Sequence, residues 1–539
     1  MLEPTNVSTQ LSPRRAPLHG VPPVGHAGEL ETWARLERFL VLGTAGGAHV
    51  AGEREPTDGG AQIVARCLAA DGLRTIDRIV DATRTGRAPT NDPALFSLAM
   101  AAKLGDEHTR RAAYAALPRV CRIGTDLMRF AAFAERFGGW GRGMRKAVGA
   151  WFNDRPAGDL ALQLARYPSQ DGWSHRDLLR LAHPRAASPS HDRLYAWAVR
   201  GELPDGALED PELALIVAVD ELRRIDEPAR AARIVREHGV PAACVPAALL
   251  GSPEVWEALL ATTPATALLR DLAAMTRVGL LAPGSAAAER VAAQLRDPGE
   301  LSAARVHPIA ILAALLAYRA GRGARGQGAW QPVASIVDAL DAAFYASFDG
   351  VEPAGKRVLL ALDVSGSMGT GSIAGVPGLT PRVASAAMAL VAAATEPGLA
   401  VLAFTAAAGG LGGKWGGGTP TLTALPISPR QRLDGVVERA GELPRGGVDC
   451  ALPMIWAHKH RVDVDTFVVY TDNETWAGDV PPAQALRAYR DARGIPAKLV
   501  VVGMTSNGFS LADPNDAGML DVVGFDTSTP PVIADFARA

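Results

Sequence analysis

The fold of this chain is decided by the stretch Leu359-Leu360-Ala361-Leu362-Asp363-Val364-Ser365-Gly366-Ser367-Met368, an apolar run that ends in Asp-x-Ser-x-Ser. Such a run is typical of a buried parallel strand. A second apolar run, residues 466–470, ends in Thr471-Asp472-Asn473-Glu474. Parallel strands of an open α/β sheet end at the same edge, where ligands bind, so we expect Asp363 and Asp472 to lie close together.

The side chains at these two strand ends predict a metal site. A carboxylate and two hydroxyls on one short loop are hard oxygen ligands, which suit Mg²⁺ or Mn²⁺ with some water retained. We expect Mg²⁺ at Asp363, Ser365 and Ser367, with Asp472 bound through water. The alternative interpretation is that Asp363 only caps a turn.

The chain from Lys356 onward alternates between strand and helix patterns. Strands are predicted at residues 357–362, 398–405, 466–470 and 498–502, and helices at 382–395, 430–440, 451–460 and 482–493. This alternation favours a parallel sheet flanked by helices. The glycine-rich residues 409–418 are expected to form a flexible loop, and they lack the spacing of a phosphate-binding loop.

The residues before Gly355 follow a helical pattern with short breaks. A helix is expected to end at Gly43, another to begin at Asp92-Pro93, and a third to begin after Gly105. Paired helices of this kind are typical of stacked helical repeats, although the spacing here is irregular.

Length and composition limit the class of protein. With 539 residues, 48% of them hydrophobic, and a net charge of −2, we expect a globular chain of two or more domains. Neither a signal core nor an apolar run of 18 residues occurs, so we expect no membrane span. No CxxC pair is present, and four distant thiols indicate a reducing compartment and a cytoplasmic protein; they are Cys67, Cys121, Cys244 and Cys450.

Charge is concentrated in one segment. Residues 101–200 hold 17 Lys and Arg against 9 Asp and Glu. A local basic field suits an anionic partner. Within it, Ser174 and Asp177 form a capping-box pattern that predicts a helix start near His175. The helical period places one group on an exposed face (Arg176, Arg180, His183) and another in the core (Leu178, Leu181, Ala182).

Several segments resemble the TROVE module of the Ro autoantigen family and its bacterial orthologues. In the first half these are Gly-Gly-Trp-Gly-Arg-Gly at 138–143 and residues 91–96, 171–181, 305–308 and 318–321. In the second half the similar segments are residues 449–457, 471–475 and 503–509. The resemblance runs from about Ala27 to the carboxyl terminus and keeps the order of the domains.

The resemblance implies an α + α/β architecture. A flexible segment at 1–27 would precede a HEAT-like helical-repeat ring at 28–354 and a Rossmann-like von Willebrand factor A domain at 355–539. It further implies that the outer surface of the ring binds Y-type small RNA. The hole would take single-stranded 3′ ends of misfolded or processed RNAs, and an exoribonuclease would act with the protein in RNA quality control.

The resemblance also identifies candidate site residues. The family's Y RNA contact matches His175, and with the basic surplus we expect RNA contacts at His175, Arg176, Arg180, Arg142, Arg145, Lys146, Arg166 and Arg185. Trp173 could stack on a base or pack between repeats. The family segment Gly-Gly-Thr-Asp-Cys reads Gly446-Gly447-Val448-Asp449-Cys450 here, so Val448 lacks the hydroxyl of the usual metal-binding threonine. Metal affinity should therefore be low, although Asp449 could substitute.

The leading function is a non-enzymatic RNA-binding scaffold of a ribonucleoprotein. One alternative is a metal-assisted RNA hydrolase, which needs a base and an activated water. No two-metal cluster of Asp, Glu and His surrounds Asp363, apart from Glu474. The other alternative is a metal-dependent protein-interaction module with no RNA role.

Overall fold

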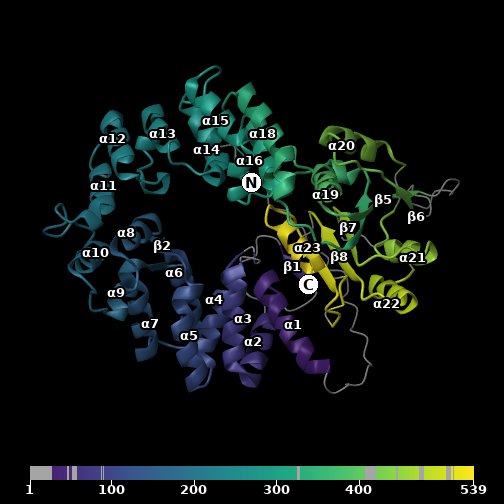
Figure 1. The fold of residues 1–539 in the computed structure, drawn as a ribbon, viewed down its shortest axis with the longest axis horizontal. Helices are drawn as coiled ribbons and strands as arrows, with labels where there is room; N and C mark the ends of the chain where they lie inside the picture. The colour runs from purple at the N-terminus through teal and green to yellow at the C-terminus, as the bar shows by residue number, and fades with distance from the viewer. Residues whose placement is uncertain are drawn as a thin grey trace, which may run out of the picture.

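The computed structural model describes residues 27–44, 48–50, 58–85, 88, 90–323, 328–406, 420–444, 447–472, 479–505, 511–513 and 515–538. The segment expected to be flexible, residues 1–27, therefore lies outside the described residues except for Ala27, and so does the glycine-rich stretch 409–418. Helices form the first part of the chain and a mixed sheet with its covering helices forms the second (Figure 1).

Among the described residues, the helical part begins with nine α-helices and a short hairpin. The helices are α1 (Ala27–Leu42), α2 (Asp58–Ala70), α3 (Gly72–Thr85), α4 (Asp92–Leu104), α5 (Glu107–Val120), α6 (Gly124–Phe137), α7 (Arg142–Asn153), α8 (Ala157–Arg166) and α9 (His175–Ala182). Before α9, an antiparallel hairpin pairs β2 (Ser169–Gln170) with β3 (Trp173–Ser174).

Nine further α-helices follow in the described part of the chain. They are α10 (Pro189–Arg200), α11 (Ala214–Leu222), α12 (Pro228–His238), α13 (Pro253–Leu260), α14 (Ala265–Arg277), α15 (Ala286–Arg296), α16 (Pro298–Ala303), α17 (Pro308–Arg319) and α18 (Ala334–Ala346). Successive helices follow an arc, with α4, α6 and α8 on its inner side and α5, α7 and α9 on its outer side (Figure 1).

The predicted helix boundaries in this part are confirmed, and each has a local cause. Gly43, with φ +75°, adopts the left-handed conformation that ends α1. Pro93 lies in the first turn of α4, where a missing N–H costs nothing. Asp106 caps α5 by accepting a hydrogen bond of 2.7 Å from the Thr109 N–H. His307 accepts from the Ile309 N–H at 3.2 Å and so caps α17.

The second part is built on a seven-stranded sheet of order β1-β9-β8-β7-β4-β5-β6. Its strands are β1 (Ala48–Val50), β4 (Arg357–Asp363), β5 (Gly398–Ala406), β6 (Pro420–Ala424), β7 (Thr466–Thr471), β8 (Lys498–Gly503) and β9 (Met519–Val523). All neighbouring strands are parallel except β6, which is antiparallel to β5. The helices are α19 (Pro381–Thr395), α20 (Leu433–Glu442), α21 (Leu452–Lys459), α22 (Pro482–Arg493) and α23 (Thr529–Arg538).

The sequence predicted the four central strands β4, β5, β7 and β8 and the helices α19 to α22. It did not predict the two edge strands β1 and β6, the last strand β9 or the last helix α23. The central strands were found because they are buried on both faces and read as continuous apolar runs. The edge strand β1 has only three residues, which is too short for a pattern.

Strand β1 joins the two parts of the chain. It lies in the sequence between α1 and α2, yet it pairs in parallel with β9, with Ala48 opposite Asp521. Beside it, the Arg38 guanidinium on α1 donates hydrogen bonds to the Ala517 carbonyl at 3.1 Å and to the Met519 carbonyl. The sheet therefore includes a strand from the amino-terminal side of residue 354.

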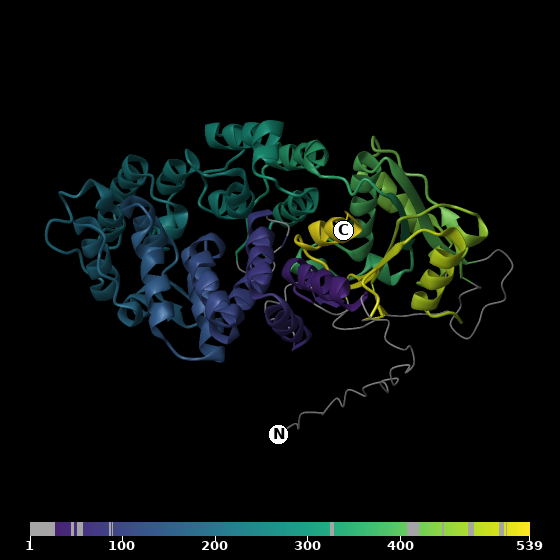
Figure 2. The same cartoon turned by 60° about the horizontal axis from the view of Figure 1, so that its bottom comes forward.

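The other end of the arc also reaches the sheet domain. Arg432, the residue before α20, forms an ion pair of 2.7 Å with Asp341 on α18. The Leu433 N–H donates to the Tyr345 hydroxyl at 2.9 Å. Both ends of the helical arc thus rest on the sheet domain, as Figures 1 and 2 show from two sides. Among the described residues, no helix is long and apolar enough to cross a membrane.

Candidate functional site

Helix α9 carries two of the predicted arginines, and its start is as predicted. The Ser174 N–H donates to Asp177 Oδ2 at 3.0 Å, and the Ser174 hydroxyl accepts from the Asp177 N–H at 3.3 Å, which completes a capping box. Leu178 and Ala182 are buried as expected, but Leu181 is 36% exposed. The buried row of α9 passes through residues 175, 178, 179 and 182, so Leu181 falls outside it.

Seven of the eight predicted RNA-binding side chains are exposed, and we call them the basic face. They lie on α7, at the end of α8, on α9 and in the loop after α9, and they are Arg142, Arg145, Lys146, Arg166, Arg176, Arg180 and Arg185. Among the described residues, none of these side chains forms an ion pair with a carboxylate. Neighbouring acids are engaged elsewhere, since Asp177 caps α9 and Asp171 pairs with Arg129 at 2.9 Å.

The loop that carries Arg185 is held by Asn153, a residue that the sequence did not single out. The Asn153 side chain donates to the Arg185 carbonyl at 2.9 Å and accepts from the Ala187 N–H at 2.9 Å. The Tyr195 hydroxyl donates to the same Asn153 oxygen at 2.7 Å. Asparagine is common at helix ends, so its presence there predicts no particular role. Its three hydrogen-bond partners are also distant in the sequence, so no local pattern could identify them.

His175 differs from the other predicted contacts because its side chain is only 3% exposed. Its ring lies 6.3 Å from the Trp151 ring in a stacked arrangement and 5.8 Å from the Phe152 ring. A Cβ added at Gly124 would lie 2.8 Å from the imidazole, so the glycine makes room for the ring. Burial lowers the pKa of His175 to about 4, so the ring is neutral at pH 7. Direct RNA contact by His175 stays a prediction that requires the ring to move outward.

Trp173 packs within the protein. Its ring lies 5.6 Å from that of Trp140, and both are partly buried against the core. The hairpin that holds Trp173 is tied to α6 by the Arg129–Asp171 ion pair, whose side chains are 12% and 24% exposed. Of the two interpretations left open for Trp173, packing is the one with a contact in the structure.

The predicted metal-site residues meet at the ends of β4 and β7. These strands are parallel neighbours with Leu362 opposite Tyr470, which places Asp363 beside Thr471. Asp363 Oδ1 accepts from the Ser365 N–H at 2.7 Å, and Oδ2 accepts from the Thr471 hydroxyl at 3.0 Å. Burial raises the pKa of Asp363, and the charge of Asp472 adds to that effect. The expected proximity of Asp363 and Asp472 is confirmed.

The donor atoms at these strand ends are oxygens, the ligand type that Mg²⁺ prefers. The Ser365 and Ser367 hydroxyls share a hydrogen bond of 3.0 Å. Among the described residues no cluster of three His, Cys, Asp or Glu side chains is close enough to hold a metal, so hydroxyls would have to complete the set. Thr471 supplies one such hydroxyl, which the sequence reasoning did not use.

The position that departs from the family pattern offers no oxygen. Val448 is buried in an apolar cluster with Cys450 and Met454. Asp449, considered as a substitute ligand, accepts from the Ala451 N–H at 2.9 Å and so caps the turn before α21. Asn473 and Glu474 lie outside the described residues. All four cysteines are buried free thiols, as predicted.

Comparison with known proteins identifies the family. Residues 25–201 and 243–317 match the TROVE domain, and residues 357–537 match the Ro60 vWA domain. RNA-binding protein RO60 of Deinococcus radiodurans is 43% identical over 507 residues, which cover 94% of this chain and 92% of that protein. The chain belongs to the Ro60 family.

Other members of the Ro60 family agree with this assignment. RNA-binding protein RO60 of Caenorhabditis elegans is 32% identical over 578 residues, covering 93% of this chain and 87% of that protein. The crystal structure of the Deinococcus radiodurans RO (RSR) protein superposes with a TM-score of 0.86 at 42% identity, covering 94% of this chain and 99% of that one. The resemblance and the fold predicted from the sequence are confirmed. These relatives are named as RNA-binding proteins and not as enzymes, in agreement with the non-enzymatic interpretation.

Proposed function

We propose that this Ro60-family chain binds structured RNA through the basic face. The observation that carries the proposal is the set of seven exposed cationic side chains on consecutive elements from α7 to the loop after α9, without carboxylate partners among the described residues. Unpaired guanidinium and ammonium groups attract a phosphate backbone and release its counterions. Helices α7 and α9 lie on the outer side of the arc, where a folded RNA can approach (Figure 1).

The family resemblance extends this proposal to the kind of RNA and to its fate. The basic face would bind a small Y-like RNA, while the space inside the arc would admit single-stranded 3′ ends of misfolded or processed RNAs. The protein would act as a ribonucleoprotein scaffold with an exoribonuclease in RNA quality control. The buried free thiols suit a cytoplasmic setting. Arg319 and Arg322 are exposed and could line this inner space. Arg325, which could join them, lies outside the described residues.

The proposal is tested by salt-dependent binding of a hairpin RNA. We choose Arg176→Gln with Arg180→Gln, because both side chains are exposed and neither supports the core. Each lost phosphate contact should reduce the slope of log K against log salt by about 0.7–0.9. The double variant should bind at least about tenfold more weakly, or about 1.4 kcal/mol.

A matched control separates this site from general charge. Arg233→Gln with Arg236→Gln removes the same charge from exposed positions of α12, away from the basic face. This control should bind the hairpin almost as tightly as the unmodified protein. Equal losses in the two double variants would mean that the affinity reflects net charge and that α9 is not the site.

We also propose that the strand ends hold Mg²⁺ through Asp363, Ser365 and Ser367, with Asp472 bound through water. The support is the set of oxygen donors at the two strand ends. The ion would neutralise the two carboxylates and leave open positions for a partner's oxygen, as in a metal-dependent interaction module. Metal-assisted hydrolysis is the competing role, and a labelled RNA that stays intact with protein and Mg²⁺ would exclude it.

A further inference from the structure

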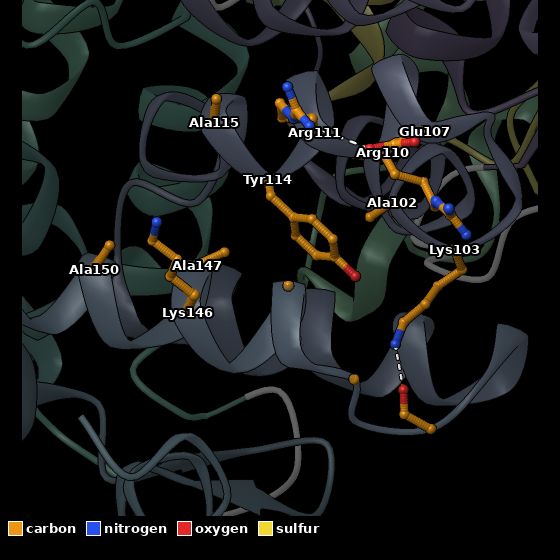
Figure 3. A pocket seen from close by; sticks show the side chains of 13 residues that line it. Ala102, Lys103, Glu107, Arg110, Arg111, Tyr114, Ala115, Lys146, Ala147 and Ala150 are labelled. Carbon is orange, nitrogen blue, oxygen red and sulfur yellow. Dashed lines mark hydrogen bonds and ion pairs between the residues drawn. The ribbon is translucent and has the colours of Figure 1, made fainter.

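A groove lies on the outer layer of the helical arc, beside the basic face. Its walls are the end of α4, the exposed side of α5 and the first turns of α7 with the glycine-rich segment before it (Figure 3). The cavity has a volume of about 670 Å³. Ligand pockets of roughly 300–1,000 Å³ are typical for small molecules and single nucleotides.

The floor of the groove is an aromatic ring. Tyr114 of α5 extends across it toward the start of α7 (Figure 3). A Cβ added at Gly143 would lie 2.8 Å from the nearest atom of the Tyr114 ring, so the glycine makes room for that edge of the ring beside α7. Burial raises the pKa of Tyr114, so the phenol is neutral at pH 7. A half-buried neutral ring on a groove floor is a surface on which a planar base can stack.

The walls of the groove carry a net positive charge. Four of the lining side chains are cationic, namely Lys103, Arg110, Arg111 and Lys146, against one carboxylate, Glu107. Glu107 is already paired with Arg111 at 3.2 Å, and the Lys103 ammonium donates to the Gly139 carbonyl at 2.6 Å. Arg110 and Lys146 have no ion-pair partner among the described residues. They come from opposite walls, on α5 and α7, with Tyr114 between them (Figure 3).

We propose that this groove binds one unpaired nucleotide of an RNA, with its base on Tyr114 and its flanking phosphates at Arg110 and Lys146. The inference rests on the proposed function, because Lys146 also belongs to the basic face. A paired base is enclosed in its helix and presents no free surface, so only a bulged, looped or flipped base can reach the ring. The groove would therefore distinguish RNAs with an unpaired base next to the duplex from RNAs that are fully paired.

The test compares two hairpin RNAs that differ by one bulged nucleotide. Stacking on an aromatic ring contributes about 1–3 kcal/mol per base, so the bulged hairpin should bind about 5- to 100-fold more tightly than the paired one. Tyr114→Leu should abolish this difference and leave the affinity for the paired hairpin unchanged. Tyr114→Phe, which keeps the ring, should retain the difference. Arg110→Gln should reduce binding of the bulged hairpin more than that of the paired one.

A second measurement uses the unmodified protein, so its result does not depend on whether a variant folds. A photoreactive 4-thiouridine at the bulge should crosslink to α5 or to the start of α7. Crosslinking elsewhere, or a preference for the bulge that survives Tyr114→Leu, would overturn the assignment of the groove. Equal binding of both hairpins would also overturn the assignment of the groove, but it would not contradict RNA binding by the basic face. If neither hairpin binds, the proposed function fails, and this inference fails with it.

Discussion

At the scale of single residues, Val448 stands out at the strand ends where we propose a metal site. Its side chain packs among Cys450 and Met454 instead of offering an oxygen. The remaining donors are two serine hydroxyls, the Thr471 hydroxyl and the carboxylates of Asp363 and Asp472. A hard cation such as Mg²⁺ gains affinity with each oxygen ligand, so an apolar side chain at this position should lower the Mg²⁺ affinity of the proposed site.

We predict that Val448→Thr raises the affinity for Mg²⁺ by about tenfold, or about 1.4 kcal/mol. Titration calorimetry with Mg²⁺ and Mn²⁺ measures this, with Asp363→Asn as the variant that should lose binding. Because burial raises the pKa of Asp363, protons compete with the metal, and binding should weaken as the pH falls. If the unmodified protein and Val448→Thr both show no heat at millimolar metal, the strand ends hold no cation.

At the scale of the element, α9 is a short helix with a complete capping box. It has only eight residues, it carries Arg176 and Arg180, and its first turn is closed by Ser174 and Asp177. The hydroxyl and carboxylate of this pair satisfy N–H groups that would otherwise have no partner at the helix start. The cap therefore helps to position Arg176 and Arg180, the two arginines of the basic face that α9 carries.

We predict that Ser174→Ala lowers the free energy of unfolding of this region by about 1 kcal/mol. Hydrogen exchange of the α9 amides measures the local effect, which should be faster than in the unmodified protein. Ser302→Ala is the control, because Ser302 is an exposed residue inside α16 rather than a cap. Unchanged exchange in α9 would show that packing alone holds the helix.

At the scale of the whole molecule, both ends of the helical arc contact the sheet domain. Arg38 on α1 bonds to two carbonyls near β9, and burial lowers its pKa to about 10. Its guanidinium also lies 5.2 Å from the centre of the Phe536 ring. At the other end, Arg432 pairs with Asp341. These contacts make the sheet domain part of the same body as the helical arc.

We predict that Arg38→Leu loosens the junction of α1 and β1 with the sheet. Charged hydrogen bonds contribute roughly 1.5–3 kcal/mol each, so the loss should be about 3 kcal/mol and should lower the first thermal transition. Hydrogen exchange at β9 gives a local readout, since its β1 edge would open. Arg66→Leu, at an exposed position of α2, is the matched control. It should change neither the thermal transition nor the hydrogen exchange of β9. A β9 that stays protected in Arg38→Leu would show that strand pairing alone holds the edge.

Local patterns in the sequence determined much of this protein. The four central strands, the ends of α1 and α4, the capping box of α9 and the exposure of Arg176 and Arg180 all follow from residues close together in the chain. Apolar periodicity, glycine and proline at helix ends and paired capping residues act over a few positions. These signals can therefore be recognised in the sequence without knowing which other elements pack against the helix or strand.

The tertiary structure alone decided the features that join distant residues. Strand β1 pairs with β9 although Ala48 and Asp521 are far apart in the chain, and three residues carry no pattern of their own. His175 is buried because Trp151, Phe152 and Gly124 from other helices enclose it. The groove exists because Tyr114 of α5 meets Gly143 of α7. Such contacts form when separate helices and strands pack against one another. A pattern of neighbouring residues in the sequence cannot predict which distant elements will meet.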